Sequence, residues 1–280
     1  MHLLQVILMG FVQGLSEFLP ISSSAHLVFT SNFYKLVKGI EISQMLQEEI
    51  FLDIMLHLGT LVAVILFFRK DLMEVLKAFY YGFKNREFNN LEFKTGVYIL
   101  LGTILTVLVA YPLNETAGML VFMPAGVGLF LVITGFMLLF SEWFSKRHSD
   151  KKPIGLKGVI LTGLAQGLAS LPGFSRSGWT IAAGLISGSD RISSARYSFL
   201  LSIPVILGAS MIYPLAKIDL SEIFTYNWLA IIIGTIVSGL SGYFCIKYFM
   251  KFLEKFSLKF FGYYCVIMGI LAYSFFIGKG

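Results

Sequence analysis

The chain has 280 residues, of which 56% are hydrophobic and only 14% are charged, and its mean hydropathy is +0.79. Because soluble domains carry about 25% charged residues, this composition excludes a soluble fold and indicates an integral membrane protein. The net charge is +6, but the basic residues lie in short connections between apolar segments. We therefore expect membrane lipids around the protein and no nucleic-acid partner.

The first apolar stretch, residues 4–30, does not fit a simple membrane span, because Pro20 and a run of serines interrupt it. It also contains Glu17 and His26. A charge at the bilayer centre costs roughly 2.5–3.5 kcal/mol, so charged side chains in an apolar stretch indicate a functional site. We expect this stretch to enter the membrane and return to its own side.

Six further segments are apolar and long enough to cross a bilayer core of about 30 Å. They are residues 51–68, 95–113, 118–140, 195–216, 228–246 and 258–277. Asp53 and His57 lie four residues apart near the start of the first of these spans. They either support a site or cap that helix.

Lysine and arginine assign the two sides of the membrane, because basic residues in short loops tend to stay cytoplasmic. Three basic loops follow the spans 51–68, 118–140 and 228–246. The connections near Asn114 and Asp219 carry at most one lysine and are predicted to face outward. Both chain termini are then predicted to lie outside.

A second interrupted apolar stretch, residues 154–190, repeats the first. VILMGFVQGLSEFLPISSSAHL from Val6 aligns without a gap on VILTGLAQGLASLPGFSRSGWT from Val159. Three spans follow each copy, so the halves, about 1–150 and 151–280, have equal content and opposite topology. This pattern is an inverted-topology repeat.

The predicted fold is a single all-α polytopic membrane domain, residues 1–280, with six transmembrane helices and two re-entrant helical hairpins. Inverted repeats place their site near the midplane, where broken helices meet. The two Ser-rich tips should therefore face one another. We interpret the glycines of the repeat, Gly10, Gly14, Gly163 and Gly167, as positions of close helix packing.

The second copy has the chemistry of an anion site. Pro172 and Gly173 should end one half-helix, and the residues that open the next are Ser175, Arg176, Ser177 and Thr180. A helix N-terminus with small hydroxyl side chains and an arginine suits a phosphate group, because it combines backbone donors, a positive dipole and a guanidinium.

The first copy supplies complementary groups. Gln13 and Glu17 share a helical face, and the polar residues after Pro20 are Ser22, Ser23, Ser24 and His26. Ser22 is a further candidate ligand of the phosphate. Glu17 could hold a hard divalent cation or act as a base. His26 could activate a hydroxyl or protonate a leaving group. The residues alone do not choose between these roles.

QGLSEFLPISSSAH and LPGFSRSGWT resemble the two signatures of the bacterial undecaprenyl-diphosphatase family, the bacitracin-resistance phosphatases. The first signature is Glu or Gln, three residues and then Glu, filled here by Gln13 and Glu17. The second is Pro-Gly-x-Ser-Arg-Ser-x-x-Thr, filled from Pro172 to Thr180. The resemblance covers essentially the whole chain.

This resemblance implies hydrolysis of undecaprenyl diphosphate to undecaprenyl phosphate and inorganic phosphate, which recycles the cell-wall lipid carrier. It implies a site open to the outer face of the bacterial plasma membrane, with Mg²⁺ or Ca²⁺ as activating ion and Glu17 as its candidate ligand. The site residues carried over by position are Glu17, Ser23, His26, Ser175, Arg176 and Thr180. Ser23 is the nucleophile candidate, with His26 or a water as alternatives. Whether the protein forms a homodimer is left open.

Gln13 departs from those family members that have glutamate at this position. An amide oxygen can still coordinate or accept a hydrogen bond, but it supplies no second carboxylate. Binding of a metal by two carboxylates is therefore in doubt, and Glu17 should matter more in this chain.

Two other functions compete with this interpretation. A polyprenyl-phosphate transporter would use the same inverted repeat and anion pocket, although it would not require Glu17, Ser23 and His26 beside the phosphate. The other superfamily of membrane lipid phosphatases has Ser-Gly-His and Ser-Arg segments, which SSSAH and SRSGWT resemble only loosely, and its separate lysine-containing motif is missing here. We prefer the undecaprenyl-diphosphatase interpretation to both alternatives.

Overall fold

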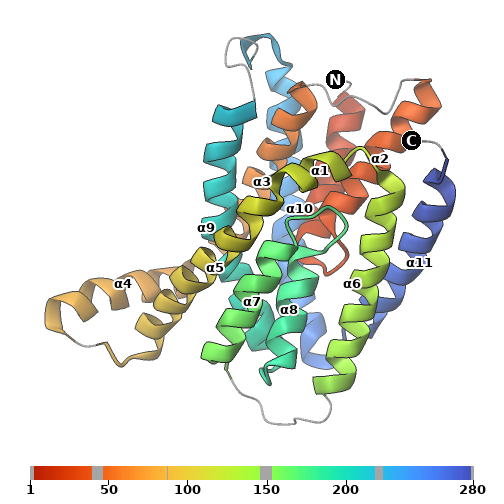
Figure 1. The fold of residues 1–280 in the computed structure, drawn as a ribbon. Coiled ribbons are helices and arrows are strands. Elements are labelled where there is room, and N and C mark those ends of the chain that lie inside the picture. Colours follow the sequence, from red (N-terminus) through yellow and green to blue (C-terminus); the bar gives the residue numbers. More distant parts are fainter. Residues whose placement is uncertain (1–2, 40–46, 87, 146–152, 218–222, 279–280) are drawn as a thin grey trace.

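The computed structural model describes residues 3–39, 47–86, 88–145, 153–217 and 223–278. The described elements are α1 (Leu3–Phe18), α2 (Ser23–Lys38), α3 (Gln47–Phe67), α4 (Arg69–Asn85), α5 (Leu91–Leu120), α6 (Pro124–Ser145), α7 (Leu156–Leu168), α8 (Arg176–Ile186), α9 (Arg191–Lys217), the 3₁₀ turn η1 (Ile223–Thr225), α10 (Trp228–Lys255) and α11 (Lys259–Phe276). Figure 1 shows these helices as one bundle, with the start of α1 and the end of α11 at the same end.

Within the described ranges, six helices are apolar and long enough to span a membrane: α3, α5, α6, α9, α10 and α11. Each corresponds to one of the six predicted spans, so the all-α polytopic fold is confirmed. The predicted position of the connection near Asn114 is wrong, because α5 continues through this residue to Leu120 and the connection to α6 follows it; that this connection faces outward stays a prediction. Pro112 lies inside α5 without ending it, as membrane helices allow. The predicted connection near Asp219 lies outside the described residues.

The two interrupted stretches each form a pair of short helices joined by a tight turn. α1 and α2 have 16 residues each, α7 has 13 and α8 has 11. All four are shorter than the roughly 20 residues that a span requires. Figure 1 shows the turns of the two pairs near the middle of the bundle, with α1–α2 and α7–α8 extending from them in opposite directions.

Glycines allow each of these helix pairs to approach a helix from the other half of the chain. A Cβ at Gly10 would lie 2.5 Å from the backbone oxygen of Gly234, so α1 can pack on α10 only without a side chain there. At the matching place in the second copy, a Cβ at Gly163 would lie 2.9 Å from the Gly102 oxygen on α5. The prediction of close packing at these glycines is confirmed.

A buried ion pair joins three separate elements near the ends of α6 and α9. Glu142 is fully buried and accepts hydrogen bonds from Arg191 at 2.7 and 2.6 Å. It also accepts one from the backbone N–H of Leu258, between α10 and α11, at 2.9 Å. This bidentate geometry is the strongest form of side-chain ion pair.

Residues 69–85, which we expected to be part of a basic loop, form the helix α4. Figure 1 shows α4 projecting sideways from the bundle beside the start of α5. The sequence interpretation missed this helix because only its basic residues were considered, whereas its apolar residues recur at helical spacing.

Candidate active site

Glu17 lies in the last turn of α1 and is 6% exposed. Its Oε2 accepts hydrogen bonds from Ser23 Oγ at 2.6 Å and from Gln13 Nε2 at 3.0 Å. Its Oε1 accepts one from Arg176 Nη2 at 2.6 Å. Glu17 therefore joins the two helix pairs, with the serine on one carboxylate oxygen and the arginine on the other.

Ser22 fixes the start of α2 and so the direction of the next side chain. Its hydroxyl accepts a hydrogen bond from the Ala25 N–H at 3.3 Å, as an N-cap does. Its φ is 69°, which is uncommon for a residue with a side chain and recurs at functional sites. Ser23 follows as the first residue of α2, within reach of Glu17.

The second turn is organised by Thr134 of α6, whose side chain is fully buried. Its Oγ1 donates to the Gly173 carbonyl at 3.1 Å and accepts from the Ser175 N–H at 3.3 Å and from Trp179 Nε1 at 3.1 Å. Gly173 has φ +98°, and a Cβ there would lie 2.4 Å from the Val127 oxygen. Only glycine fits this turn.

The two turns meet, as the sequence predicted. Ser175 caps α8 by accepting from the Gly178 N–H at 3.1 Å. Ser177 in the first turn of α8 donates to the Leu19 carbonyl of the opposite turn at 2.9 Å, and Arg176 reaches Glu17. The N-termini of α2 and α8, both positive dipole ends, are thus directed to one place, which is a favourable environment for a phosphate.

Two buried polar atoms at this meeting point have no hydrogen-bond partner within the described part of the chain. They are Arg176 Nη1 and Gln13 Oε1. A buried polar atom without a partner is costly, and native structures usually satisfy it with a ligand, ion or water. Arg176 Nη1 could donate to an anion, and Gln13 Oε1 could accept from water or bind a cation.

His26 is held away from Ser23. Its Nδ1 lies 2.8 Å from the Ser22 carbonyl, which can only accept, so Nδ1 carries the proton. Its Nε2 then accepts from the Tyr264 hydroxyl at 2.7 Å, and the two rings stack at 5.7 Å. Of the two bases considered for Ser23, Glu17 rather than His26 is the one in hydrogen-bond contact with it.

Asp53 and His57 lie on α3, one turn apart. His57 Nε2 is 3.7 Å from Glu17 Oε2, and His57 Nδ1 is 2.8 Å from the Asp53 carbonyl. The Asp53 side chain is 41% exposed and reaches the site only through His57. The structure thus places His57 beside the site and Asp53 behind it.

The remaining predicted phosphate ligands are largely occupied by protein contacts. Thr180 Oγ1 lies 2.7 Å from the Arg176 carbonyl and 2.5 Å from Ser198 Oγ on α9. The Ser22 and Ser175 hydroxyls cap their helices. Direct phosphate contacts by these three hydroxyls stay a prediction. Arg176 Nη1 has free donor capacity, and so do the backbone N–H groups of Arg176 and Ser177, because the helix cap formed by Ser175 takes only that of Gly178.

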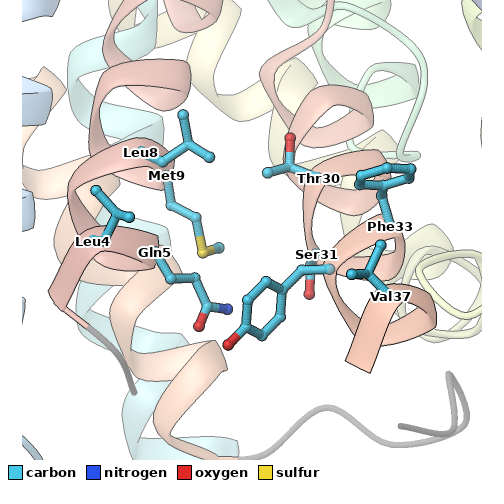
Figure 2. A pocket seen from close by; sticks show the side chains of 9 residues that line it. Leu4, Gln5, Leu8, Met9, Thr30, Ser31, Phe33 and Val37 are labelled. Carbon is cyan, nitrogen blue, oxygen red and sulfur yellow. The ribbon is translucent and has the colours of Figure 1, made fainter. Parts of the chain in front are cut away.

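Two apolar cavities lie next to the first helix pair. One of about 410 Å³ separates α1 from α2, and Figure 2 shows Leu4, Leu8 and Met9 facing Thr30, Phe33 and Val37 across it. The other, of about 670 Å³, lies between α2 and α11 and includes His26 in its lining. This second cavity is an apolar groove that reaches the edge of the site at His26.

Sequence reasoning missed Thr134 and Tyr264. Each is an ordinary residue within an apolar span, and neither belongs to a motif. The one available signal for Thr134 was a polar side chain within an apolar span. For Tyr264 there was no signal, because its contact with His26 is made across 238 positions of the sequence.

Comparison with known proteins identifies the family. The family model "Bacitracin resistance protein BacA" matches residues 6–271. The chain belongs to this family. A relative from Halothermothrix orenii called undecaprenyl-diphosphatase is 41% identical over 271 residues, covering 97% of each chain. Relatives of the same name from Methanobrevibacter smithii and Nitrosococcus oceani are 38% and 36% identical, and the matches cover 97% or more of each chain.

For this member of the bacitracin resistance protein family, the match includes every residue of the site described above. The name of the relatives is that of a diphosphatase. The transporter alternative gains no support from them.

Proposed function

We propose that this chain is an integral membrane phosphatase that hydrolyses undecaprenyl diphosphate to undecaprenyl phosphate and inorganic phosphate. The observation that carries the proposal is the chain of hydrogen bonds from Ser23 through Glu17 to Arg176. It combines a hydroxyl, a carboxylate in contact with it and a guanidinium with a free donor. Nucleophile, base and anion ligand are thereby collected at one buried point.

The terminal phosphate is bound by Arg176 Nη1 and by the N–H groups that open α8, which neutralise charge on its oxygens. Ser23 Oγ attacks the terminal phosphorus and passes its proton to Glu17. The bond from this phosphorus to the bridging oxygen breaks, and undecaprenyl phosphate leaves with that oxygen and the proton from Glu17.

Hydrolysis of the phosphorylated serine completes the reaction. A water attacks the phosphorus, Glu17 accepts its proton and returns one to Ser23 Oγ, and inorganic phosphate is released. The transition state of phosphoryl transfer is loose, so positioning and charge neutralisation matter more than a strong base. A single carboxylate is sufficient for this sequence of steps.

A divalent cation, Mg²⁺ or Ca²⁺, fits the donors beside Glu17. Within the described ranges, no three His, Cys, Asp or Glu side chains are grouped to hold a metal, but the unpartnered Gln13 Oε1 adjoins the Glu17 carboxylate. Glu17 and Gln13 would hold the ion, with substrate oxygens and water as its other ligands, as Mg²⁺ prefers. The ion would supply charge neutralisation at the diphosphate.

The apolar groove between α2 and α11 suits the polyprenyl chain of the substrate. Its lining side chains are mainly apolar, and it begins at His26 beside the site. We place both termini outside, as the basic loops predict. We place the protein in the bacterial plasma membrane with the site open to the outer face, as the family resemblance implies. This orientation fits an enzyme that recycles the lipid carrier of the cell wall.

The test is release of inorganic phosphate from undecaprenyl diphosphate by the purified protein in detergent. Wild-type protein should release phosphate, and the isosteric variant Glu17→Gln should lose activity by about a hundredfold or more. Glu254→Gln, an exposed position on α10, is the control and should keep full activity. A wild-type protein that binds this lipid without hydrolysing it would contradict the proposal.

A further inference from the structure

Helix α4 is tied to the membrane surface at both ends. Only Phe68 separates the spanning helix α3 from α4, and the spanning helix α5 begins at Leu91, shortly after α4 ends at Asn85. Because α3 and α5 are both long and apolar enough to span a membrane, we expect these ends to meet the same membrane surface. α4 is about 25 Å long at 1.5 Å per residue, so it must run along this surface rather than across the bilayer.

One face of α4 is packed against the protein. Ala78 and Gly82 are buried, and Phe79 stacks on Phe93 of α5 with ring centroids 4.8 Å apart. Asp71 forms an ion pair with Arg196 in the second turn of α9. These contacts fix both the position of α4 and its rotation about its own axis.

The face of α4 that is left exposed has a regular composition. Met73, Leu76, Tyr80 and Phe83 recur three or four residues apart and are 52%, 63%, 63% and 67% exposed, so they form one apolar stripe. Phe83 at the end of the stripe contacts the Phe93 ring of α5, with ring centroids 5.8 Å apart, and the described part of the chain leaves more than half of each of the four side chains uncovered.

A row of lysines follows the edge of the apolar stripe. Lys70, Lys77 and Lys84 are spaced by seven residues, two helical turns, and all three are exposed. Glu74 is the one exposed acid on this helix, since Asp71 is paired with Arg196. An apolar stripe beside a basic row is the pattern of a helix lying in the membrane interface.

We propose that the exposed face of α4 binds anionic phospholipid. Met73, Leu76, Tyr80 and Phe83 lie in the boundary between headgroups and acyl chains, and the lysine row holds the negatively charged headgroups. The basic loops predict that this is the cytoplasmic leaflet, whose surface is negative and attracts lysine near a membrane helix. The binding partner is therefore membrane lipid, selected by the negative charge of its headgroup.

The position of the stripe can be measured in the full-length protein reconstituted into vesicles. A nitrobenzoxadiazole label on Leu76→Cys should be quenched by lipids that carry bromine near the headgroup and shielded from dithionite. The same label on Glu74→Cys, on the opposite face, should react with dithionite. Equal reaction at the two positions would overturn the proposal, and disulfide-linked dimers of Leu76→Cys would identify a second copy as the occupant instead.

The choice of lipid can be measured by electron spin resonance with spin-labelled phosphatidylglycerol and phosphatidylcholine. Wild-type protein should associate preferentially with phosphatidylglycerol, and Lys70→Gln/Lys77→Gln/Lys84→Gln should reduce this preference by about fivefold or more, since each lysine near an anionic surface contributes about that factor. The charge-matched variant with three arginines should keep it. A glutamine variant with wild-type preference would contradict the proposal. Neither measurement depends on phosphatase activity.

Discussion

At the scale of single residues, the site is defined by which base contacts the serine. Ser23 Oγ is 2.6 Å from Glu17 Oε2, whereas both ring nitrogens of His26 are engaged by Ser22 and Tyr264. Glu17 is in turn held by Arg176. The geometry therefore favours a serine and carboxylate pair, and it gives His26 a place at the boundary between the site and the apolar groove.

Replacement of Arg176 tests the anion ligand. Arg176→Ala should lower kcat by about a hundredfold to a thousandfold, because it removes a preorganised donor to the phosphate. Arg176→Lys keeps the charge but loses the planar fork, so we expect an intermediate rate. Turnover is measured by phosphate release, with detergent-solubilised yield and helicity as controls for folding. Wild-type turnover by Arg176→Ala would refute its role.

Replacement of Ser23 tests the nucleophile. Ser23→Ala should reduce turnover by about a thousandfold or more, because it removes the attacking oxygen. The matched control is Ser24→Ala, which should retain most activity, because the Ser24 hydroxyl contacts that of Ser22, whereas the hydroxyl that contacts Glu17 belongs to Ser23. When wild-type protein is mixed with substrate that carries a labelled terminal phosphate and the reaction is rapidly quenched, the label should be trapped on Ser23. Substantial turnover by Ser23→Ala would point to an activated water.

The charged members of the site could be predicted from the sequence, and its supporting residues could not. Glu17 and Arg176 stand out because ionisable side chains are expensive within apolar stretches. Thr134 and Tyr264 act through contacts between helices distant in the chain, and nothing in their local sequence records those contacts. Helix ends that converge from two parts of a chain become visible only once the packing of α1 on α10 and of α7 on α5 is known.

At the scale of elements, the ends of the helices are held by different kinds of ion pair. Glu142 is fully buried against Arg191, whose side chain is 33% exposed. Asp71 and Arg196 form a pair whose arginine is 51% exposed. Burial decides which of these pairs the fold depends on, because solvent screens the exposed one.

We expect Glu142→Ala to lower the free energy of unfolding by about 2–4 kcal/mol. The substitution leaves the Arg191 guanidinium and the Leu258 N–H without their acceptor, and the partial exposure of Arg191 reduces the cost below that of a fully buried pair. Asp71→Asn is the control, with an expected loss below about 1 kcal/mol. Denaturation in mixed detergent micelles measures both. Equal losses in the two variants would contradict the dependence on burial.

At the scale of the whole molecule, the first helix of each pair is packed mainly on the half of the chain to which it does not belong. α1 contacts α10, α7 contacts α5, and glycines make both approaches possible. Figure 1 shows both turns within the same central region. The halves are thereby interlocked, and neither has a complete site of its own.

Division of the chain tests this interlocking. Residues 1–150 and 151–280 expressed singly should show no phosphate release, whereas the two co-expressed halves should copurify and restore it. Gly14→Leu in the first half should abolish copurification, because a Cβ there would lie 2.5 Å from the Ser238 carbonyl of α10. Activity of either half alone would contradict the arrangement.

The spans and their order were predictable because hydrophobic length is a local property of the sequence. The exact ends of the helices were less so: α5 continues past Asn114, and α4 is a helix where we expected a loop. Both depend on how a segment meets the membrane surface and its neighbours. The inverted orientation of the two halves stays a prediction.

The pairing of α1 with α10 also has a consequence for biogenesis. The ribosome makes about 5–20 residues per second, so roughly ten seconds or more pass between synthesis of the first helix and that of its packing partner. During this interval α10 is not yet present to pack on α1, so the side chains of Glu17 and Gln13 lack part of the protein that surrounds them in the finished fold. We expect the nascent first hairpin to depend on the insertion machinery or a membrane chaperone until the last third of the chain has been translated.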